Sequence, residues 1–163
     1  MKKIVLFTLC LIIGIMIYHK NEEIIIPRDA IRIRIIANSN NINDLYKKKK
    51  LKNEIMNEIN TLVKDSSNIL EARDNINNNL SFIDKLVGSK TNDYHIKYGM
   101  NYFPRKSYKG IVYKEGEYES LVITLGQGLG DNWWCVLYPP LCLIDDITDD
   151  IQYRSLVYDI LQN

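Results

Sequence analysis

The spacing of apolar residues changes along this chain, and that change limits the fold more than any other feature of the sequence. Near the start of the polar part, Ile31, Ile33 and Ile35 alternate with Arg32 and Arg34. A period of two is typical of a β-strand, because successive side chains point to opposite faces of a sheet. The segment is therefore predicted to be a strand with one buried face.

Two stretches with helical spacing follow. The first is predicted to run from about Asp44 to Lys64, after an Asn-rich turn at 38–43, and the second from about 69 to 88. The apolar stripes comprise Leu51, Ile55, Ile59 and Leu62 in the first helix and Ile69, Ala72, Ile76, Leu80 and Ile83 in the second. Both helices are therefore predicted to be amphipathic, with lysines 47–50 on a solvated face.

The second half of the chain returns to the period of β-strands. The pattern predicts a strand over 94–98 that ends at Gly99, and a hairpin of 110–114 with 118–125. The remaining predicted elements are a strand over 133–138 and a helix over 151–161. The predicted fold class is α+β: an N-terminal strand and two amphipathic helices, followed by a mostly antiparallel sheet in a single small domain.

The N-terminus has the pattern of an export segment. Two lysines precede an uncharged, mainly apolar run from Ile4 to Tyr18. As a helix this run would span roughly 22 Å, less than the roughly 30 Å of a bilayer core. A cleaved signal peptide and a retained membrane anchor stay equal alternatives for residues 1–20, ahead of a buried core helix. We expect a linker over 21–30, a domain over 31–163, and membrane contact through the N-terminal segment if it is uncleaved.

The charge balance argues against nucleic-acid binding. The whole chain has 21 basic and 20 acidic residues, for a net charge of +1. Without Lys2, Lys3 and Lys20 of the export segment, 18 basic residues stand against 20 acidic ones. A nucleic-acid-binding domain would have a basic surplus, which this domain lacks.

Three glycines, Gly126, Gly128 and Gly130, invite comparison with nucleotide-binding loops. Their spacing is G-x-G-x-G and a strand-like segment follows, whereas a dinucleotide fingerprint needs G-x-G-x-x-G before a helix. A P-loop would need Gly-Lys-Ser/Thr, which the sequence lacks. The pattern favours a tight turn between two strands, and we expect no cofactor.

Catalytic and metal-binding patterns are weak. Apart from His19 in the export segment, His95 is the one histidine that could act as a base, and its strand pattern favours a surface position. A Cys135–His95 dyad is therefore a minor alternative. The acidic cluster at 145–150 is expected to be solvent-exposed. Cys135 and Cys142 have poor spacing for zinc; in an exported chain a disulfide is favoured over two buried thiols.

The two tryptophans of the chain are adjacent, in the stretch GDNWWCVLYPPLC. On a strand, Trp133 and Trp134 point to opposite faces, so one can fill the core while the other is exposed, covered or available to a partner. Aromatic side chains on rigid frames are frequent hot spots of binding. We interpret this stretch as a stiff surface for a partner, with Trp133, Trp134, Tyr138 and Pro139 as candidate contacts and Asn38 as a turn former near the end of the first strand.

The same stretch carries a family resemblance. Together with FPRKSYKG (103–110), EGEYESLVITLGQG (115–128) and IRIRIIANSN (31–40), it resembles the stage II sporulation protein R family of endospore-forming bacteria. The resemblance covers nearly all of the chain after the export segment.

The resemblance implies a signalling protein without catalytic activity of its own. Such a protein is exported across the forespore membrane into the intermembrane space. There it activates a membrane-bound aspartic protease, which removes the pro-sequence of sigma-E. Two alternatives stay open at this point: an exported module that binds cell wall or carbohydrate through a tryptophan, and, less favoured, a cysteine hydrolase that uses Cys135.

Overall fold

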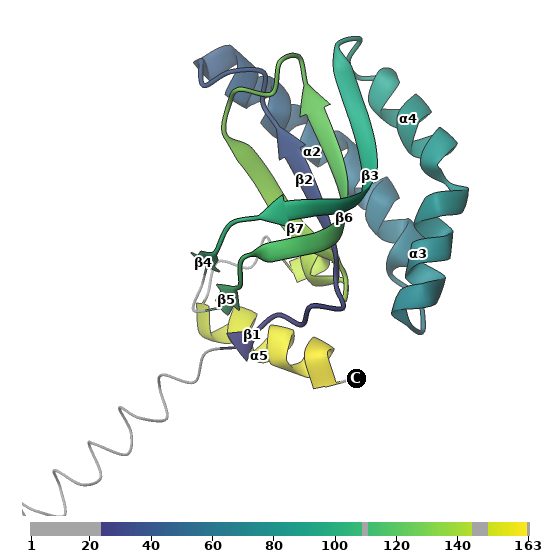
Figure 1. Ribbon diagram of the computed structural model, residues 1–163, viewed down its shortest axis with the longest axis vertical. Coiled ribbons are helices and arrows are strands. Elements are labelled where there is room, and N and C mark those ends of the chain that lie inside the picture. Colours follow the sequence, from purple (N-terminus) through teal and green to yellow (C-terminus); the bar gives the residue numbers. More distant parts are fainter. Residues whose placement is uncertain (1–23, 109–110, 145–149, 163) are drawn as a thin grey trace, which may run out of the picture.

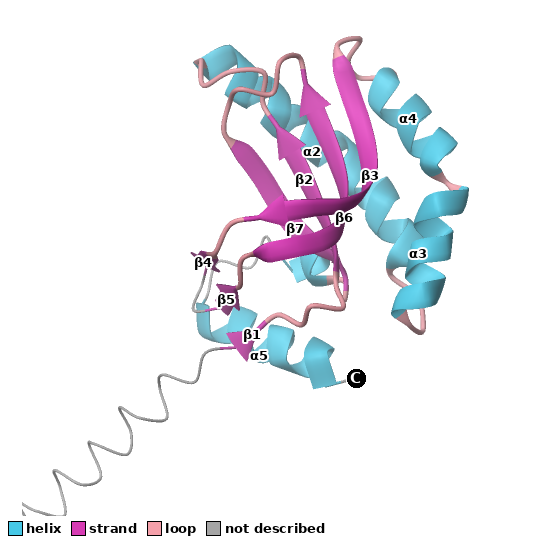
Figure 2. Cartoon of the chain, viewed as in Figure 1, coloured by secondary structure: helices cyan, strands magenta, loops and turns pink. Residues whose placement is uncertain are grey.

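The computed structural model describes residues 24–108, 111–144 and 150–162 and has the predicted α+β class (Figures 1 and 2). The strands are β1 (Ile24–Ile25), β2 (Ile31–Ile36), β3 (Tyr94–Phe103), β4 (Lys106–Tyr108), β5 (Ile111–Tyr113), β6 (Gly116–Leu125) and β7 (Asn132–Tyr138). The helices are α2 (Ile42–Val63), α3 (Ile69–Asn78), α4 (Leu80–Gly88) and α5 (Asp150–Gln162), with a short 3-10 turn, η1, at Leu141–Ile144.

The main sheet has the strand order β3-β6-β2-β7. Its two outer pairs, β3 with β6 and β2 with β7, are antiparallel, whereas the central pair of β2 and β6 is parallel. A smaller sheet has the order β1-β5-β4 and lies at one end of the main sheet (Figure 1). The first predicted strand is thus a central strand, flanked on both sides by strands from the second half of the chain.

The predicted hairpin and the predicted end of β3 are both wrong. Gly99 adopts a φ of 146°, and the strand continues through it to Phe103. Glycine tolerates this backbone conformation, so β3 bends with β6 instead of ending (Figure 1). The extended β3 pairs with the whole of β6, and β5 pairs instead with β1 and β4.

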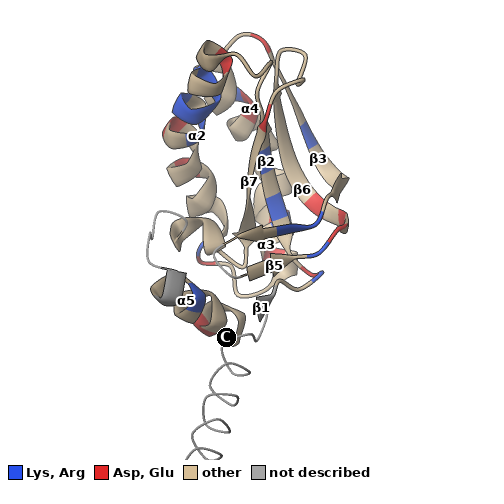
Figure 3. Cartoon of the chain, turned by 90° about the vertical axis from the view of Figure 1, so that its left-hand side faces the viewer, with Lys and Arg blue, Asp and Glu red and all other residues tan. Residues whose placement is uncertain are grey.

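Helices α2, α3 and α4 cover one face of the main sheet (Figures 1 and 3). The predicted stripe of α2 is buried there against the isoleucines of β2. The second helix is not continuous as predicted, because α3 ends and α4 begins at Asn79, whose side chain donates to the carbonyl of Asn75 at 2.8 Å. At the start of α3, the side chain of Asn68 accepts from the backbone N–H of Glu71, the geometry of an N-cap.

The small sheet and α5 lie at one end of the main sheet and form a second buried cluster there with Val136 of β7 (Figure 3). The buried residues of this second cluster are Ile26, Ala30, Ile111, Tyr113, Val136, Leu141, Tyr153 and Val157. Two of them, Ile26 and Ala30, come from the stretch expected as a linker, and β1 of the same stretch pairs with β5. The strand predicted to have one buried face is also buried on its other face at Arg32, whereas Arg34 and Ile36 on that face are half-buried.

The Asn-rich turn and the glycine-rich turn pack against each other at the far end of the sheet. The side-chain oxygen of Asn38 accepts from the backbone N–H of Gln127 at 2.9 Å, and its amide nitrogen donates to the Asp44 carboxylate at 2.8 Å. Hydrogen bonds from Ser39 and Asn38 hold the pKa of Asp44 below its usual value. The turn before α2 is thereby fixed to the loop before β7.

The glycines at 126–130 are required by this contact, as a turn rather than a nucleotide loop. Gly126 and Gly128 have φ values of 53° and 66°, as predicted for a tight turn. A Cβ atom on Gly130 would lie 2.3 Å from the backbone oxygen of Ser39. The loop therefore approaches the turn too closely for any side chain at this position.

A buried carboxylate connects α3 to the sheet. Arg73 donates two hydrogen bonds to Glu119 through Nε and Nη2 at 2.8 Å each, and the Tyr98 hydroxyl donates at 2.7 Å. The hydrogen bonds from Arg73 lower the pKa of Glu119. The Glu119 side chain is 16% exposed, so most of its charge is balanced by these partners rather than by water.

We expect Gly130→Ala to lower the free energy of unfolding by about 1–3 kcal/mol, because the Ser39 backbone must move away from the new methyl group. Thermal unfolding of the full chain in a mild neutral detergent measures this. Leu129→Ala is the matched control: Leu129 is 74% exposed, and its loss should change stability by about 0.5 kcal/mol or less. Equal effects of the two substitutions would contradict the packing of the two turns.

We expect Glu119→Gln to lower stability by about 1–2 kcal/mol at pH 7, a figure reduced for the partial exposure of Arg73. The folded pKa of Glu119 is below its unfolded value, so the stabilisation is present above about pH 4 and is lost as pH falls through the folded value. Denaturant unfolding between pH 7 and pH 3 should show the two proteins converging. Glu117→Gln, at an exposed position of the same strand, should show no such trend.

Candidate partner-binding surface

The two tryptophans lie on opposite sides of β7, as predicted, and both are half-buried. Trp133 packs against the helix-side core, where Nζ of Lys52 lies 5.1 Å from the centroid of its ring. Trp134 packs on the other side against Phe103 and Tyr113, at centroid distances of 5.5 and 4.9 Å in edge-to-face geometry. Neither indole is therefore a freely exposed platform.

Arg32 is enclosed by aromatic rings on the same side as Trp134. None of its surface is exposed. Its guanidinium carbon lies 3.4 Å from the ring centroid of Tyr118 and 5.0 Å from that of Phe103. Trp134 and Tyr113 complete the enclosure at 5.2 and 6.0 Å. We call these four rings the aromatic cage; they stabilise the cation through the negative potential of their faces.

The charge of Arg32 has no hydrogen-bond acceptor in the described structure. The ring of Tyr118 lies against the guanidinium, while its hydroxyl donates to the carbonyl of Lys114 at 3.0 Å. Burial lowers the pKa of Arg32 to about 10, so the group stays charged at neutral pH. A buried cation without an acceptor reduces stability unless something else compensates for it.

A second arginine of β2 lies beside the cage. Arg34 donates to the carbonyl of Tyr102, and its guanidinium carbon lies 4.0 Å from the ring centroid of Phe103. Its Nε is buried without a hydrogen-bond partner among the described residues, and burial lowers its pKa. Phe103 therefore contacts two positively charged groups.

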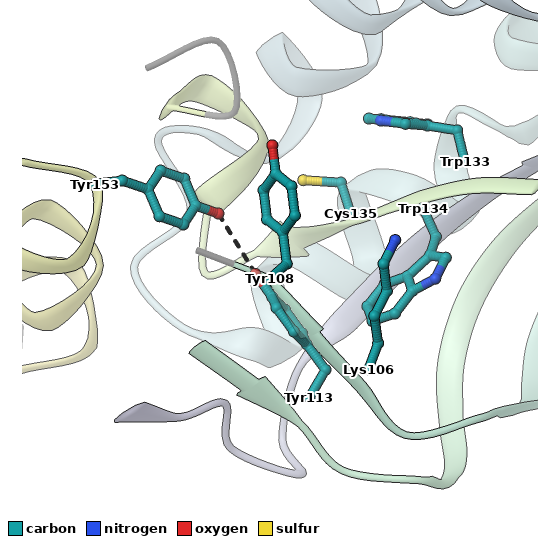
Figure 4. Close-up of a pocket in the computed structure, with 7 residues that line it drawn as sticks. All are labelled: Lys106, Tyr108, Tyr113, Trp133, Trp134, Cys135 and Tyr153. Atoms are coloured by element: carbon teal, nitrogen blue, oxygen red, sulfur yellow. Dashed lines mark hydrogen bonds between the residues drawn. The ribbon is translucent and has the colours of Figure 1, made fainter. Parts of the chain in front are cut away.

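A pocket of about 100 Å³ opens next to the cage, along the free edge of β7 (Figure 4). Its lining residues are Lys106, Tyr108, Tyr113, Trp133, Trp134, Cys135 and Tyr153. Nζ of Lys106 lies 5.0 Å from the centroid of Trp134, and the hydroxyls of Tyr113 and Tyr153 are 3.4 Å apart. The pocket is thus an aromatic hollow with a cation at its rim and the buried guanidinium behind its wall.

The other candidate contacts lie at opposite ends of the sheet. Tyr138 pairs with Ile31 at one end of β2, followed by Pro139 and its turn, whereas Asn38 follows the other end. Seven residues of extended chain separate the two ends by roughly 20 Å. Trp133, Trp134 and Tyr138 share one strand, but Asn38 serves the packed turns and does not join them.

The two cysteines are thiols in this structure, so the bridge predicted from the sequence is not formed in it. Both sulfurs lie near the carbonyl of Val136, with Cys142 at 3.0 Å and Cys135 at 3.9 Å. The disulfide stays a prediction for the exported protein.

The structure does not assemble a Cys135–His95 dyad. His95 is exposed on β3, and the two central strands lie between it and β7, a separation of roughly 14 Å across the sheet. Among the described ranges, no group of three or more His, Cys, Asp or Glu residues could hold a metal ion. Residues 145–149 of the acidic cluster lie outside those ranges.

Sequence reasoning missed most of the cage. Phe103 and Lys106 belong to the stretch FPRKSYKG, but no spacing rule connects that stretch to Arg32, which is more than 70 residues earlier. The one available signal was the pair of arginines in β2, which the pattern placed opposite the buried isoleucines.

The predicted export segment, residues 1–20, lies outside the described residues. Within the part of the chain that the structure does describe, none of the helices has the length and apolar character needed to cross a bilayer.

The comparisons with known proteins agree with the resemblance in the sequence. The family model of Stage II sporulation protein R (spore_II_R) matches residues 27–148. The "Stage II sporulation protein R" of Bacillus subtilis (strain 168) is 43% identical over 136 residues, which cover 77% of this chain and 59% of that protein. The chain thus matches about three-fifths of the length of this relative. No solved structure matches. The matched region contains the whole cage and every lining residue of the pocket except Tyr153, and the chain belongs to the stage II sporulation protein R family.

Proposed function

We propose that this chain is an exported signalling protein of sporulation, which activates a membrane-bound aspartic protease and thereby causes removal of the pro-sequence of sigma-E. In this proposal it crosses the forespore membrane into the intermembrane space and has no catalytic activity of its own. The observation that carries the proposal is the family membership, which spans residues 27–148 and includes the aromatic pocket apart from Tyr153.

The pocket supports a role in protein binding. Half-buried aromatic rings on a rigid frame, with a polar rim, are typical of the centres of protein interfaces. Here two indoles and three tyrosines surround one small hollow, and the sheet edge beside it holds them in place. The partner-contact residues that we propose are Trp133 and Trp134, together with Tyr108 at the rim and Tyr138 and Pro139 at the end of the same strand.

The two alternatives receive less support from the geometry. A carbohydrate-binding tryptophan needs a free ring face, but cations lie 5.0–5.2 Å from the centroids of both indoles, and Trp134 is also flanked by two rings. A cysteine hydrolase needs a base near Cys135, and His95 lies on the opposite edge strand.

The proposal is tested by co-expressing this chain with the matched membrane protease and its pro-sigma substrate in a host that does not sporulate. We expect cleavage of the pro-sequence when the full chain is present. It should stop when the chain is omitted or when residues 1–20 are deleted. Absence of cleavage with all three proteins stably made and correctly located would contradict the proposal.

In the same assay we expect Tyr108→Ala to reduce cleavage about tenfold or more, as for a hot-spot aromatic residue. Tyr108 is 38% exposed and lines the pocket, so its removal should leave the core intact. Tyr46→Ala on α2 is the matched control, because that tyrosine is also exposed but lies outside the pocket. Similar losses in both variants, at equal protein levels, would place the contact surface elsewhere.

A further inference from the structure

The face of the main sheet that points away from the helices has basic residues and no acidic ones. Strand pairing and alternation place fifteen residues on this face: Arg32, Arg34 and Ile36 of β2; Tyr118, Ser120, Val122 and Thr124 of β6; His95, Lys97, Gly99, Asn101 and Phe103 of β3; and Asn132, Trp134 and Val136 of β7. Its formal charge is therefore positive, although the domain as a whole is slightly acidic. Figure 3 marks the basic positions of β2 in blue along the strand.

Three cations of this region lie next to two aromatic rings. Phe103 has Arg32 and Arg34 next to its ring, at 5.0 and 4.0 Å. Trp134 has Arg32 and Lys106 next to its ring, at 5.2 and 5.0 Å. Two adjacent rings therefore contact three positive charges. Their mutual repulsion is unfavourable unless an anion lies nearby.

No carboxylate within the described residues pairs with any of these three cations. On the helix side of the same sheet, by contrast, Glu119 balances the charge of Arg73. The described residues therefore leave room on the other face for an anion that a partner could supply.

We propose that an acidic segment of the protein partner docks on this face, with a carboxylate at Lys106 in the pocket and with Arg34 beside Phe103 and the buried Arg32 supplying further positive charge. The proposal rests on the proposed function in that the partner is taken to be the activated protease. A protein segment fits better than a lipid surface, because the hollow of about 100 Å³ takes the end of one side chain, and the third cation lies behind aromatic rings.

The first test changes charge at the rim in the cleavage assay. We expect Lys106→Glu to reduce pro-sequence cleavage at least tenfold while leaving the melting temperature unchanged, since Lys106 is exposed. Lys49→Glu, an equal charge change at an exposed position of α2, should keep wild-type cleavage. Wild-type cleavage by the Lys106→Glu variant would overturn the proposal.

The second test separates the role of Arg32 in binding from its role in folding. Arg32→Met replaces a buried cation that has no acceptor by an apolar side chain of similar length, so the variant should melt at the same or a higher temperature. Cleavage should nevertheless fall at least tenfold. A stable variant with normal cleavage would overturn the role of Arg32. If the variant fails to fold, the result for Lys106→Glu alone supports or overturns the proposal.

The third test measures acid binding without the protease. The full chain with Trp133→Phe, in neutral detergent, keeps Trp134 as its one fluorophore of this type. Titration with hexaglutamate should change its emission, Lys106→Glu should abolish the change, and added salt should weaken it. Hexalysine is the control peptide.

The outcomes of the three tests are distinguishable. Hexaglutamate binding without pro-sequence cleavage in the presence of the wild-type chain would refute the proposed function but support the acid-binding face. Wild-type cleavage without hexaglutamate binding, together with insensitivity to Lys106→Glu, would refute the acid-binding face alone. Binding to phosphatidylglycerol vesicles through Lys106, with no response to hexaglutamate, would identify a lipid surface as the ligand and overturn the protein-partner proposal.

Discussion

Strand β2 is buried along one face and, at Arg32, on the other face too, and the rest of the main sheet is arranged around it. Its isoleucines meet the helices on one side, and Arg32 meets the aromatic cage on the other. A strand that is buried on both faces needs neighbours on both edges, and β6 and β7 supply them from the second half of the chain. The two halves therefore cannot fold as separate units, although their sequence patterns differ.

The central pair of β2 and β6 is parallel, and parallel strands need a long connection between them. Here the connection contains α2, α3 and α4 and the strands β3, β4 and β5, and the three helices cover the isoleucine face (Figure 2). The far end of the sheet is closed by direct contact between the Asn-rich and glycine-rich turns, through Asn38 and Asp44. Away from this contact, the guanidinium groups of Arg32 and Arg34 have nitrogens that find no hydrogen-bond partner among the described residues.

Charged side chains on the two faces of the main sheet have different kinds of partner. On the helix side, Glu119 is matched by Arg73 and Tyr98 in short hydrogen bonds, which is what a stable interior requires. On the cage side, Arg32 has aromatic rings but no acceptor. Cation–π contacts offset part of the desolvation of a guanidinium but do not replace its hydrogen bonds. This contrast within one sheet is the physical basis for assigning the cage side to a partner.

The sequence by itself determined the fold class, the extent of α2 and of β7, the turn made by the glycines, and the family, because each of these depends on local spacing or on one contiguous motif. It did not determine strand order, the continuation of β3 through Gly99, or the break at Asn79, which follow from pairing and packing between distant segments. The same holds for the candidate site. The two adjacent tryptophans were evident in the sequence, but the cage brings together Arg32, Phe103, Tyr113, Tyr118 and Trp134 from five strands. Only the tertiary structure brings three rings of the other strands of the main sheet and Tyr113 of the second sheet around Arg32, because that enclosure depends on strand pairing and packing between distant segments.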